Sequence, residues 1–215
     1  GRVVYEYNSE EKLPAAGLTR LAALVSVCKG FDEGRLKPGD AVSVSEKAAG
    51  IGGTTAFLKA GEQMDAETML LAAVMINAGD ATHSLAAAGS ESAAVQEINA
   101  CMAGIGVETN FSEICGAGEK LSASELAKIG AALTASESYR KFGTKFYEKI
   151  EHNTGAGATE LANPNKLVKQ YSGCIGVGTG SSTEAGYCGV FAAKRGKTSL
   201  PNATKPYLGT SKKPT

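Results

Sequence analysis

One predicted helical segment, about one third of the way along the chain, is apolar on almost every side. Residues 66–76 read Ala-Glu-Thr-Met-Leu-Leu-Ala-Ala-Val-Met-Ile, and Asp65 precedes them, where its carboxylate can cap the first turn. A helix that lacks a polar face has to be covered by other elements. The fold must therefore wrap this helix at its centre, and 215 residues are enough for one or two domains with a core of that size.

Further helices are expected around this central one. Apolar residues recur at helical spacing from Leu18 to Cys28, and Gly30 is predicted to end that helix. The same spacing relates the apolar residues from Val95 to Met102. Ser122–Glu125 forms a capping box at the start of another amphipathic helix.

Strands are expected near both ends of the chain. The segments Val3–Tyr7 and Val42–Ser45 are rich in β-branched or aromatic residues. Cys174–Val177 and Gly186–Ala193 are predicted to form a hairpin through a tight turn at Gly180–Thr183. This order of elements indicates an α+β fold in which a helical subdomain is inserted between sheet elements.

Several residues with chemical potential have simpler structural explanations. The glycine-rich segment 49–61 does not fit the phosphate-loop or dinucleotide-binding patterns. Asp80 is predicted to cap a helix over residues 81–88. His83 on that helix is expected to be a packed or surface residue, and His152 lies in a polar loop with no predicted role.

The composition excludes several classes of protein. The 22 basic and 22 acidic residues balance, which gives no basic patch for nucleic acid, and no apolar run is long enough for a membrane span. We expect no signal peptide, because the chain opens directly on Gly1–Tyr7. An odd number of cysteines without a C-x-x-C pair argues against zinc and favours reduced, buried thiols. A nucleophilic Cys115 or Cys174 is a weaker alternative, since only two histidines could serve as its base.

The segment Pro14-Ala15-Ala16-Gly17-Leu18-Thr19-Arg20 resembles the P-x-A-S-L-T-K segment of the serine D-Ala-D-Ala carboxypeptidases, the low-molecular-weight penicillin-binding proteins. Ordered matches continue through residues 45–64, 163–167, 183–188 and 192–195. The resemblance implies a β-lactamase-like, D,D-peptidase-like antiparallel sheet flanked by helices, with an inserted helical subdomain. It implies one domain over residues 1–197 that lacks the first strand of the family. Residues 198–215, rich in Lys, Pro, Ser and Thr, are predicted to be a poorly ordered tail.

The residues that carry the chemistry of this family are replaced. Ser-x-x-Lys works because residues three apart share one helix face, where lysine can take the serine proton. Gly17 has no side chain to acylate, and Arg20 stays protonated and cannot act as a base. Thr19 is predicted to point to another face of the helix.

The other two motifs are altered as well. By resemblance to the family, Asn77 occupies the position of the serine and Gly79 the position of the asparagine in the Ser-x-Asn motif. Gly178-Thr179-Gly180 stands at Lys-Thr-Gly, the edge strand that places the substrate. The backbone N–H groups of Gly17 and Ser181 correspond to the oxyanion hole, and replaced side chains do not remove such donors.

The resemblance therefore predicts a D-Ala-D-Ala carboxypeptidase-like protein of peptidoglycan metabolism that is catalytically inactive and binds stem peptide or β-lactam. The alternative is an active carboxypeptidase that trims terminal D-Ala with other residues, and a third reading is a scaffold that binds neither. The inactivity could be natural or the result of deliberate substitution. By resemblance we expect neither metal nor organic cofactor, and a location in the bacterial cell envelope outside the cytoplasm.

Overall fold

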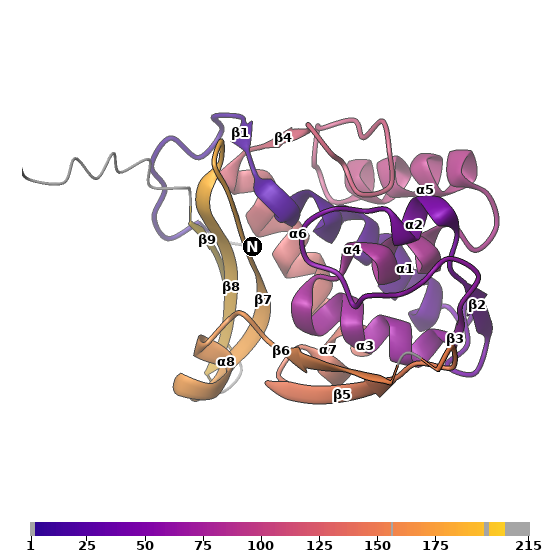
Figure 1. Cartoon of the computed structure of the whole chain (residues 1–215). Coiled ribbons are helices and arrows are strands. Elements are labelled where there is room, and N and C mark those ends of the chain that lie inside the picture. Colours follow the sequence, from indigo (N-terminus) through magenta and orange to yellow (C-terminus); the bar gives the residue numbers. More distant parts are fainter. Residues whose placement is uncertain (1–2, 156, 196–197, 205–215) are drawn as a thin grey trace, which may run out of the picture.

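The computed structural model describes residues 3–155, 157–195 and 198–204. Helices form most of the molecule, and a three-stranded antiparallel sheet lies along one flank (Figure 1). The helical segments are η1 (Ala16–Thr19), α1 (Arg20–Asp32), α2 (Glu46–Ala49), α3 (Ala66–Ile76), α4 (Gly79–Ala86), α5 (Glu91–Gly104), α6 (Ala123–Ala135), α7 (Glu137–Phe142) and α8 (Leu167–Gln170). The strands are β1 (Leu13–Pro14), β2 (Ala41–Ser43), β3 (Gln63–Asp65), β4 (Lys120–Leu121), β5 (Tyr147–Glu151), β6 (Ala158–Ala162), β7 (Cys174–Ser182), β8 (Gly186–Arg195) and β9 (Thr198–Thr204).

The predicted apolar helix is α3, which packs against α4, α7, β3 and β6. Met69 and Leu70 of α3 are fully buried, and the Asp65 carboxylate accepts a hydrogen bond of 2.8 Å from Thr68 N at the start of the helix. Around α1 pack α4, α5, α6 and α7. The helix α3 is thus covered as its apolar sequence requires, but α1 occupies the central position predicted for α3.

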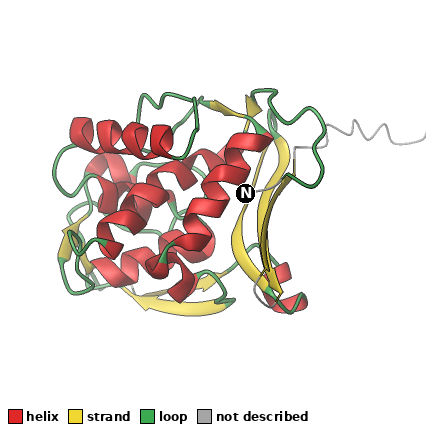
Figure 2. Ribbon diagram, turned by 180° about the vertical axis from the view of Figure 1, so that it is seen from behind, coloured by secondary structure: helices red, strands yellow, loops and turns green. Residues whose placement is uncertain are grey.

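The sheet runs in the order β7-β8-β9, and among the described strands β7 pairs only with β8. Gly178 pairs with Val190, and Gly180 pairs with Cys188. The helix α6 packs on this sheet, and η1 packs against β7 and β8. Figure 2 shows the sheet curving along one side of the helices. The expected α+β class is confirmed, and the edge strand β7 runs next to the start of α1.

A local sequence signal correctly predicted the start of α6. Glu125 N donates to Ser122 Oγ at 3.2 Å, and Ser122 N donates to Glu125 Oε2 at 2.9 Å, so the predicted capping box is present. Leu126, Ile129 and Leu133 face the core. The two-stranded ribbons β1–β4, β2–β3 and β5–β6 complete the fold.

A buried hydrogen-bonded cluster fastens the β5–β6 ribbon to the loop before β3. His152 Nδ1 lies 2.8 Å from Glu62 Oε1, and its Nε2 lies 2.8 Å from Thr159 Oγ1. The other carboxylate oxygen of Glu62 accepts a hydrogen bond from Lys59 N. The His152 side chain is only 2% exposed, so this residue has a structural role that its polar surroundings in the sequence did not indicate.

The predicted strand at Val3–Tyr7 is wrong. No strand forms there, and Val3, Tyr5 and Tyr7 have exposed side chains. A strand needs a neighbouring strand for its backbone hydrogen bonds, and no described strand lies beside this segment. Side-chain preference for a strand is not sufficient without that partner.

The prediction that Gly30 ends its helix is also wrong, since α1 continues to Asp32. The Gly30 carbonyl accepts hydrogen bonds from Arg35 N and Leu36 N, and a Cβ atom at position 30 would lie 3.3 Å from Leu36 Cδ1. The glycine leaves room for the returning chain to cross the last turn of α1.

The terminal strands are longer than expected. β7 continues to Ser182, so the turn lies at Thr183–Ala185 and not at Gly180–Thr183. Ser182 Oγ accepts a hydrogen bond from Ala185 N, and Gly186 supplies a positive φ of 64°. The predicted disordered tail is wrong for Thr198–Thr204, which pairs with β8 as β9. The rest of that segment, 205–215, lies outside the described residues.

Candidate active site

The turn that leads into α1 carries strain beside the residue where a nucleophile would stand. Ala16 has a φ of 49°, which is unfavourable for a residue with a Cβ atom. Gly17 follows and is half-buried. Thr19 Oγ1 donates a hydrogen bond of 2.8 Å to Cys115 O, so this hydroxyl is held away from Gly17, as predicted.

The junction between α3 and α4 touches this turn. Asn77 closes α3 in the left-handed conformation, with a φ of 55°, which asparagine tolerates better than most residues. Its Nδ2 atom donates a hydrogen bond of 2.6 Å to Gly17 O. Residues 60 positions apart in the sequence therefore meet at one point.

Arg20 is buried and acts as an internal anchor. Its Nη1 atom donates to Thr54 O at 2.9 Å and to Asn77 O at 3.3 Å, while Nη2 donates to Gly52 O. Arg20 is only 8% exposed. Arg20 is thus not a solvated helix residue, and its guanidinium places a fixed positive charge beside Gly17.

Gly79 gives the Arg20 guanidinium the space that it occupies. A Cβ atom at position 79 would lie 2.8 Å from Arg20 Cζ and 2.7 Å from Ile51 Cγ2, closer than real Cβ atoms approach other atoms. The guanidinium therefore fills volume that an asparagine side chain at position 79 would need. The replacements at positions 20 and 79 are sterically matched.

The edge strand β7 passes the same point. A Cβ atom at Gly180 would lie 3.3 Å from Gly17 N, so the two backbones are in close approach. Gly178 faces Leu18 and Leu21 of the core instead. Thr179 is half-buried, and Ser181 is exposed. The structure thus brings the turn at Gly17, the α3–α4 junction and β7 together.

Asp80 has a different task from the one predicted. The helix α4 begins at Gly79 with Ala78 as its N-cap, so Asp80 lies inside the first turn. Its buried carboxylate accepts hydrogen bonds from Ala56 N at 2.9 Å and from Leu58 N at 3.0 Å. It thereby holds the glycine-rich loop beside the site. These partners are more than 20 residues away, and no local sequence pattern pointed to them.

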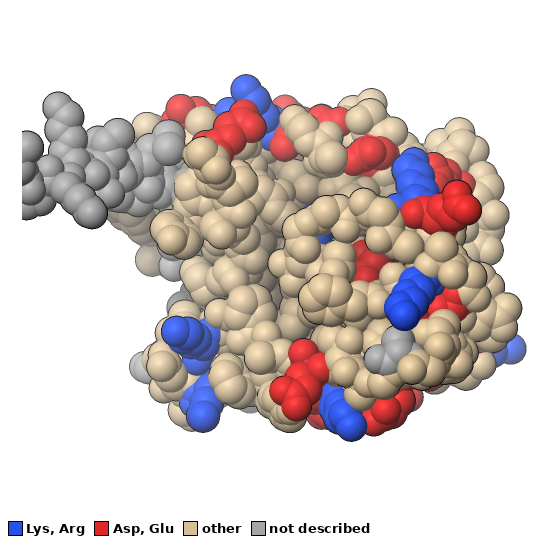
Figure 3. Space-filling view, in the orientation of Figure 1, with Lys and Arg blue, Asp and Glu red and all other residues tan. Residues whose placement is uncertain are grey.

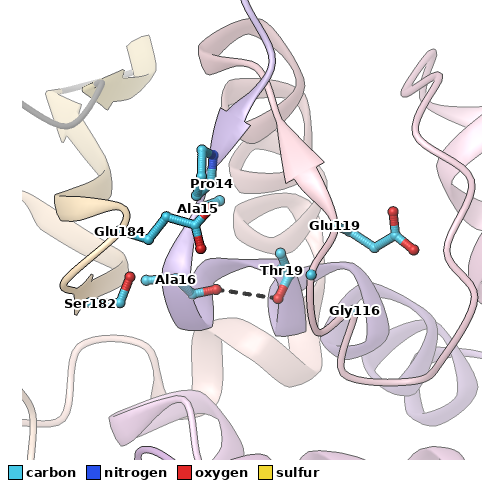
Figure 4. A pocket seen from close by; sticks show the side chains of 9 residues that line it. Pro14, Ala15, Ala16, Thr19, Gly116, Glu119, Ser182 and Glu184 are labelled. Atoms are coloured by element: carbon cyan, nitrogen blue, oxygen red, sulfur yellow. Dashed lines mark hydrogen bonds between the residues drawn. The ribbon is translucent and has the colours of Figure 1, made fainter.

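Two pockets flank Gly17. The smaller, of about 210 Å³, lies between η1, the loop at Gly116 and the end of β7, with Ser182 and Glu184 on the strand side (Figure 4). The larger, of about 470 Å³, extends from Gly17 and Arg20 to Lys47 and His83. In the space-filling view, a hollow bordered mainly by uncharged residues separates the sheet from the helical body (Figure 3).

Burial shifts the pKa of two groups in the larger pocket, Cys115 and His83. Desolvation raises the pKa of the Cys115 thiol to about 11, although the nearby Arg20 opposes this shift. Burial also lowers the pKa of His83, in spite of the neighbouring carboxylate of Glu91. A neutral thiol is a poor nucleophile. All five cysteines are buried and unpaired, which confirms the prediction of reduced, buried thiols.

This fold and this meeting of three motifs define the class of the D,D-peptidases. The model of the D-alanyl-D-alanine carboxypeptidase family matches residues 1–204, and the chain belongs to that family. It is 34% identical over 202 residues to the D-alanyl-D-alanine carboxypeptidase DacF of Bacillus subtilis (strain 168). That match covers 91% of this chain and 52% of DacF, so the chain spans about half the length of this relative.

Solved structures agree on the fold. The Streptomyces K15 DD-transpeptidase superposes with a TM-score of 0.81 at 23% identity, covering 94% of this chain and 84% of that one. The D-alanyl-D-alanine carboxypeptidase of Mycobacterium tuberculosis H37Rv superposes with a TM-score of 0.83 at 21% identity, covering 97% of this chain and 79% of that one. The predicted family and the penicillin-binding-protein fold are confirmed.

Among the described residues, none of the helices is long and apolar enough to cross a membrane. Within the same residues, no group of three or more His, Cys, Asp or Glu side chains is placed to hold a metal ion.

Proposed function

We propose that this chain is a catalytically inactive D-Ala-D-Ala carboxypeptidase-like protein that binds peptidoglycan stem peptide without cleaving it. The observation that carries the proposal is the Arg20 guanidinium. It is buried beside Gly17, bonded to three backbone carbonyls, and sits where the family places its lysine. By family membership, the protein acts in the bacterial cell envelope, outside the cytoplasm, and its other expected ligand is a β-lactam.

The absence of hydrolysis follows from the side chains at the site. Gly17 offers no nucleophile, and arginine cannot accept a proton at any pH at which the protein is folded. Cys115 lines the pocket, but burial keeps its thiol protonated. Loss of the nucleophile alone lowers turnover by a factor on the order of 10⁶ in a serine hydrolase.

Peptide binding depends on backbone groups that the replacements do not affect. Among the described strands, β7 has a partner on one side only, so an extended peptide can pair with its free edge. The N–H groups of Gly17 and Ser181 correspond to the oxyanion-hole donors of the family, and Gly180 lies against Gly17. The expected affinity is modest, because the charge-assisted contacts of the family are replaced.

A labelled penicillin and a peptide ending in D-Ala-D-Ala test the two halves of the proposal separately. We expect no covalent penicillin adduct in denaturing electrophoresis, reversible peptide binding by calorimetry, and no release of D-Ala. The same peptide ending in L-Ala-L-Ala is the control and should bind more weakly. A covalent adduct or released D-Ala would contradict inactivity. Failure to bind either ligand would leave a scaffold that uses the family fold alone.

A further inference from the structure

The larger pocket beside Gly17 has a buried cation in its wall. The Arg20 guanidinium forms no ion pair with a carboxylate of the described residues, since its hydrogen bonds go to backbone carbonyls. Lys47 also lines this pocket, but its ammonium group is paired with Glu91. A carboxylate of Glu113 lies at the wall and accepts a hydrogen bond from Ala117 N. A buried charge without a counter-ion is costly, so the pocket favours an anion.

His83 supplies an independent observation in the same pocket. Its side chain is 3% exposed, and neither ring nitrogen has a hydrogen-bond partner. The nearest carboxylate oxygen, Oε1 of Glu91, is 3.4 Å from Nε2. Buried polar atoms in folded proteins are almost always paired, and the exceptions call for an explanation. A ligand in the pocket would provide the missing partner.

We propose that this pocket binds a small carboxylate ion, held by the fixed charge of Arg20 and by a ring N–H of His83. A single unpaired cation matches a monoanion, and the carboxylate of Glu113 disfavours a dianion such as phosphate. The remaining wall, which includes Ala16, Ile51 and the glycines on either side of Ile51, suits a short alkyl group. The source is either a free small acid or the terminal carboxylate of a peptide. This proposal does not require the one made above for stem peptide.

The two histidines of the chain make a direct test possible by NMR of the imidazole rings. His83 is the reporter, and His152, paired with Glu62 and Thr159, is an internal reference. N-acetyl-D-alanine, its uncharged amide and inorganic phosphate are titrated at constant pH and ionic strength. We expect a saturable shift of His83 with the acid only, and none of His152. An equal response to the amide, a stronger response to phosphate, or no saturable response would overturn the proposal.

Substitutions test whether Arg20 supplies the positive charge that holds the carboxylate. Arg20→Met should weaken binding of N-acetyl-D-alanine by about tenfold or more, measured by backbone amide shifts. Arg140→Met is the matched control and should leave binding unchanged, because the Arg140 guanidinium also donates to backbone carbonyls but lies outside the pocket. If Arg20→Met does not fold, His83→Leu serves instead, with a loss of about threefold or more expected. Wild-type affinity in the folded variant would contradict the proposal.

The source of the carboxylate is decided with the peptide ending in D-Ala-D-Ala. If the peptide shifts the imidazole signals of His83, and if Arg20→Met weakens peptide binding, the terminal carboxylate enters the pocket. If the peptide binds without moving His83, a free acid is the ligand. If the peptide does not bind while N-acetyl-D-alanine does, the proposed function fails and the carboxylate pocket stands.

Discussion

Two buried polar clusters in this molecule satisfy their hydrogen bonds in opposite ways. Beneath the β5–β6 ribbon, both ring nitrogens of His152 are partnered, by Glu62 and Thr159. In the larger pocket, neither ring nitrogen of His83 forms a hydrogen bond, although Nε2 lies 3.4 Å from Glu91 Oε1, and Arg20 forms no ion pair with a carboxylate of the described residues. The first cluster is complete within the fold and stabilises it. The second is incomplete, which is the state expected of a site that a ligand completes.

The largest expected effect is a difference in stability when each of the two histidines is replaced by leucine. His152→Leu should lower the free energy of unfolding by about 3 kcal/mol, because it leaves the buried Glu62 carboxylate without its main partner. His83→Leu should be neutral or stabilising, since it removes a buried ring that makes no hydrogen bond. Urea unfolding at pH 7.5 measures both. Equal losses would remove the distinction between a structural cluster and a binding cluster.

A smaller effect is expected where Arg20 and Gly79 meet. Gly79→Asn should destabilise by about 2 kcal/mol, because the new side chain collides with the guanidinium. Adding Arg20→Lys should recover part of that loss, with a coupling free energy of about 1 kcal/mol in a double-mutant cycle. Gly104→Asn is the control, since a Cβ atom there meets nothing within 4 Å. Additive effects of the Arg20 and Gly79 changes would show that the replacements are not matched.

The smallest expected effect is a pH dependence that belongs to His83. Burial lowers its pKa in the folded state below the ordinary value of 6.5, so the unfolded chain binds this proton more readily. The contribution to stability is therefore present above pH 6.5 and is lost as the pH falls through the lower folded-state pKa. Glu91, Lys47 and Glu113 are the charged groups that act on this ring. The fall in stability between pH 7.5 and pH 5, followed by urea unfolding, should be smaller in His83→Leu. An equal fall in stability in the wild-type protein and in His83→Leu would contradict this prediction.

Local features of the fold could be predicted from the sequence because their partners are close in the chain. Asp65 is three residues from the N–H group that it caps, and Ser122 and Glu125 cap one another across the same distance. The segment Val3–Tyr7 was predicted wrongly because a strand depends on a neighbour that local preference cannot supply. The strand β9 was missed for the related reason that pairing with β8 outweighs an unfavourable composition.

The candidate site was located by the resemblance, but its internal contacts were not. Positions 17, 77 and 79 were named from motifs, and the structure brings them together. Arg20 donates to three backbone carbonyls that lie more than 30 residues away in the sequence, so no local pattern could predict these contacts. The same applies to the unpartnered ring of His83, because whether a buried histidine finds a partner depends on side chains from other elements.

The matched shapes of Arg20 and Gly79 bear on the proposed inactivity. Asparagine at position 79 collides with the arginine at position 20, and lysine at position 20 gains no asparagine neighbour while position 79 is glycine. Under that proposal, either change alone leaves the pair without one of its family side chains, and the first also lowers stability. The two family residues therefore have to return together, in addition to changes at positions 17, 77 and 178.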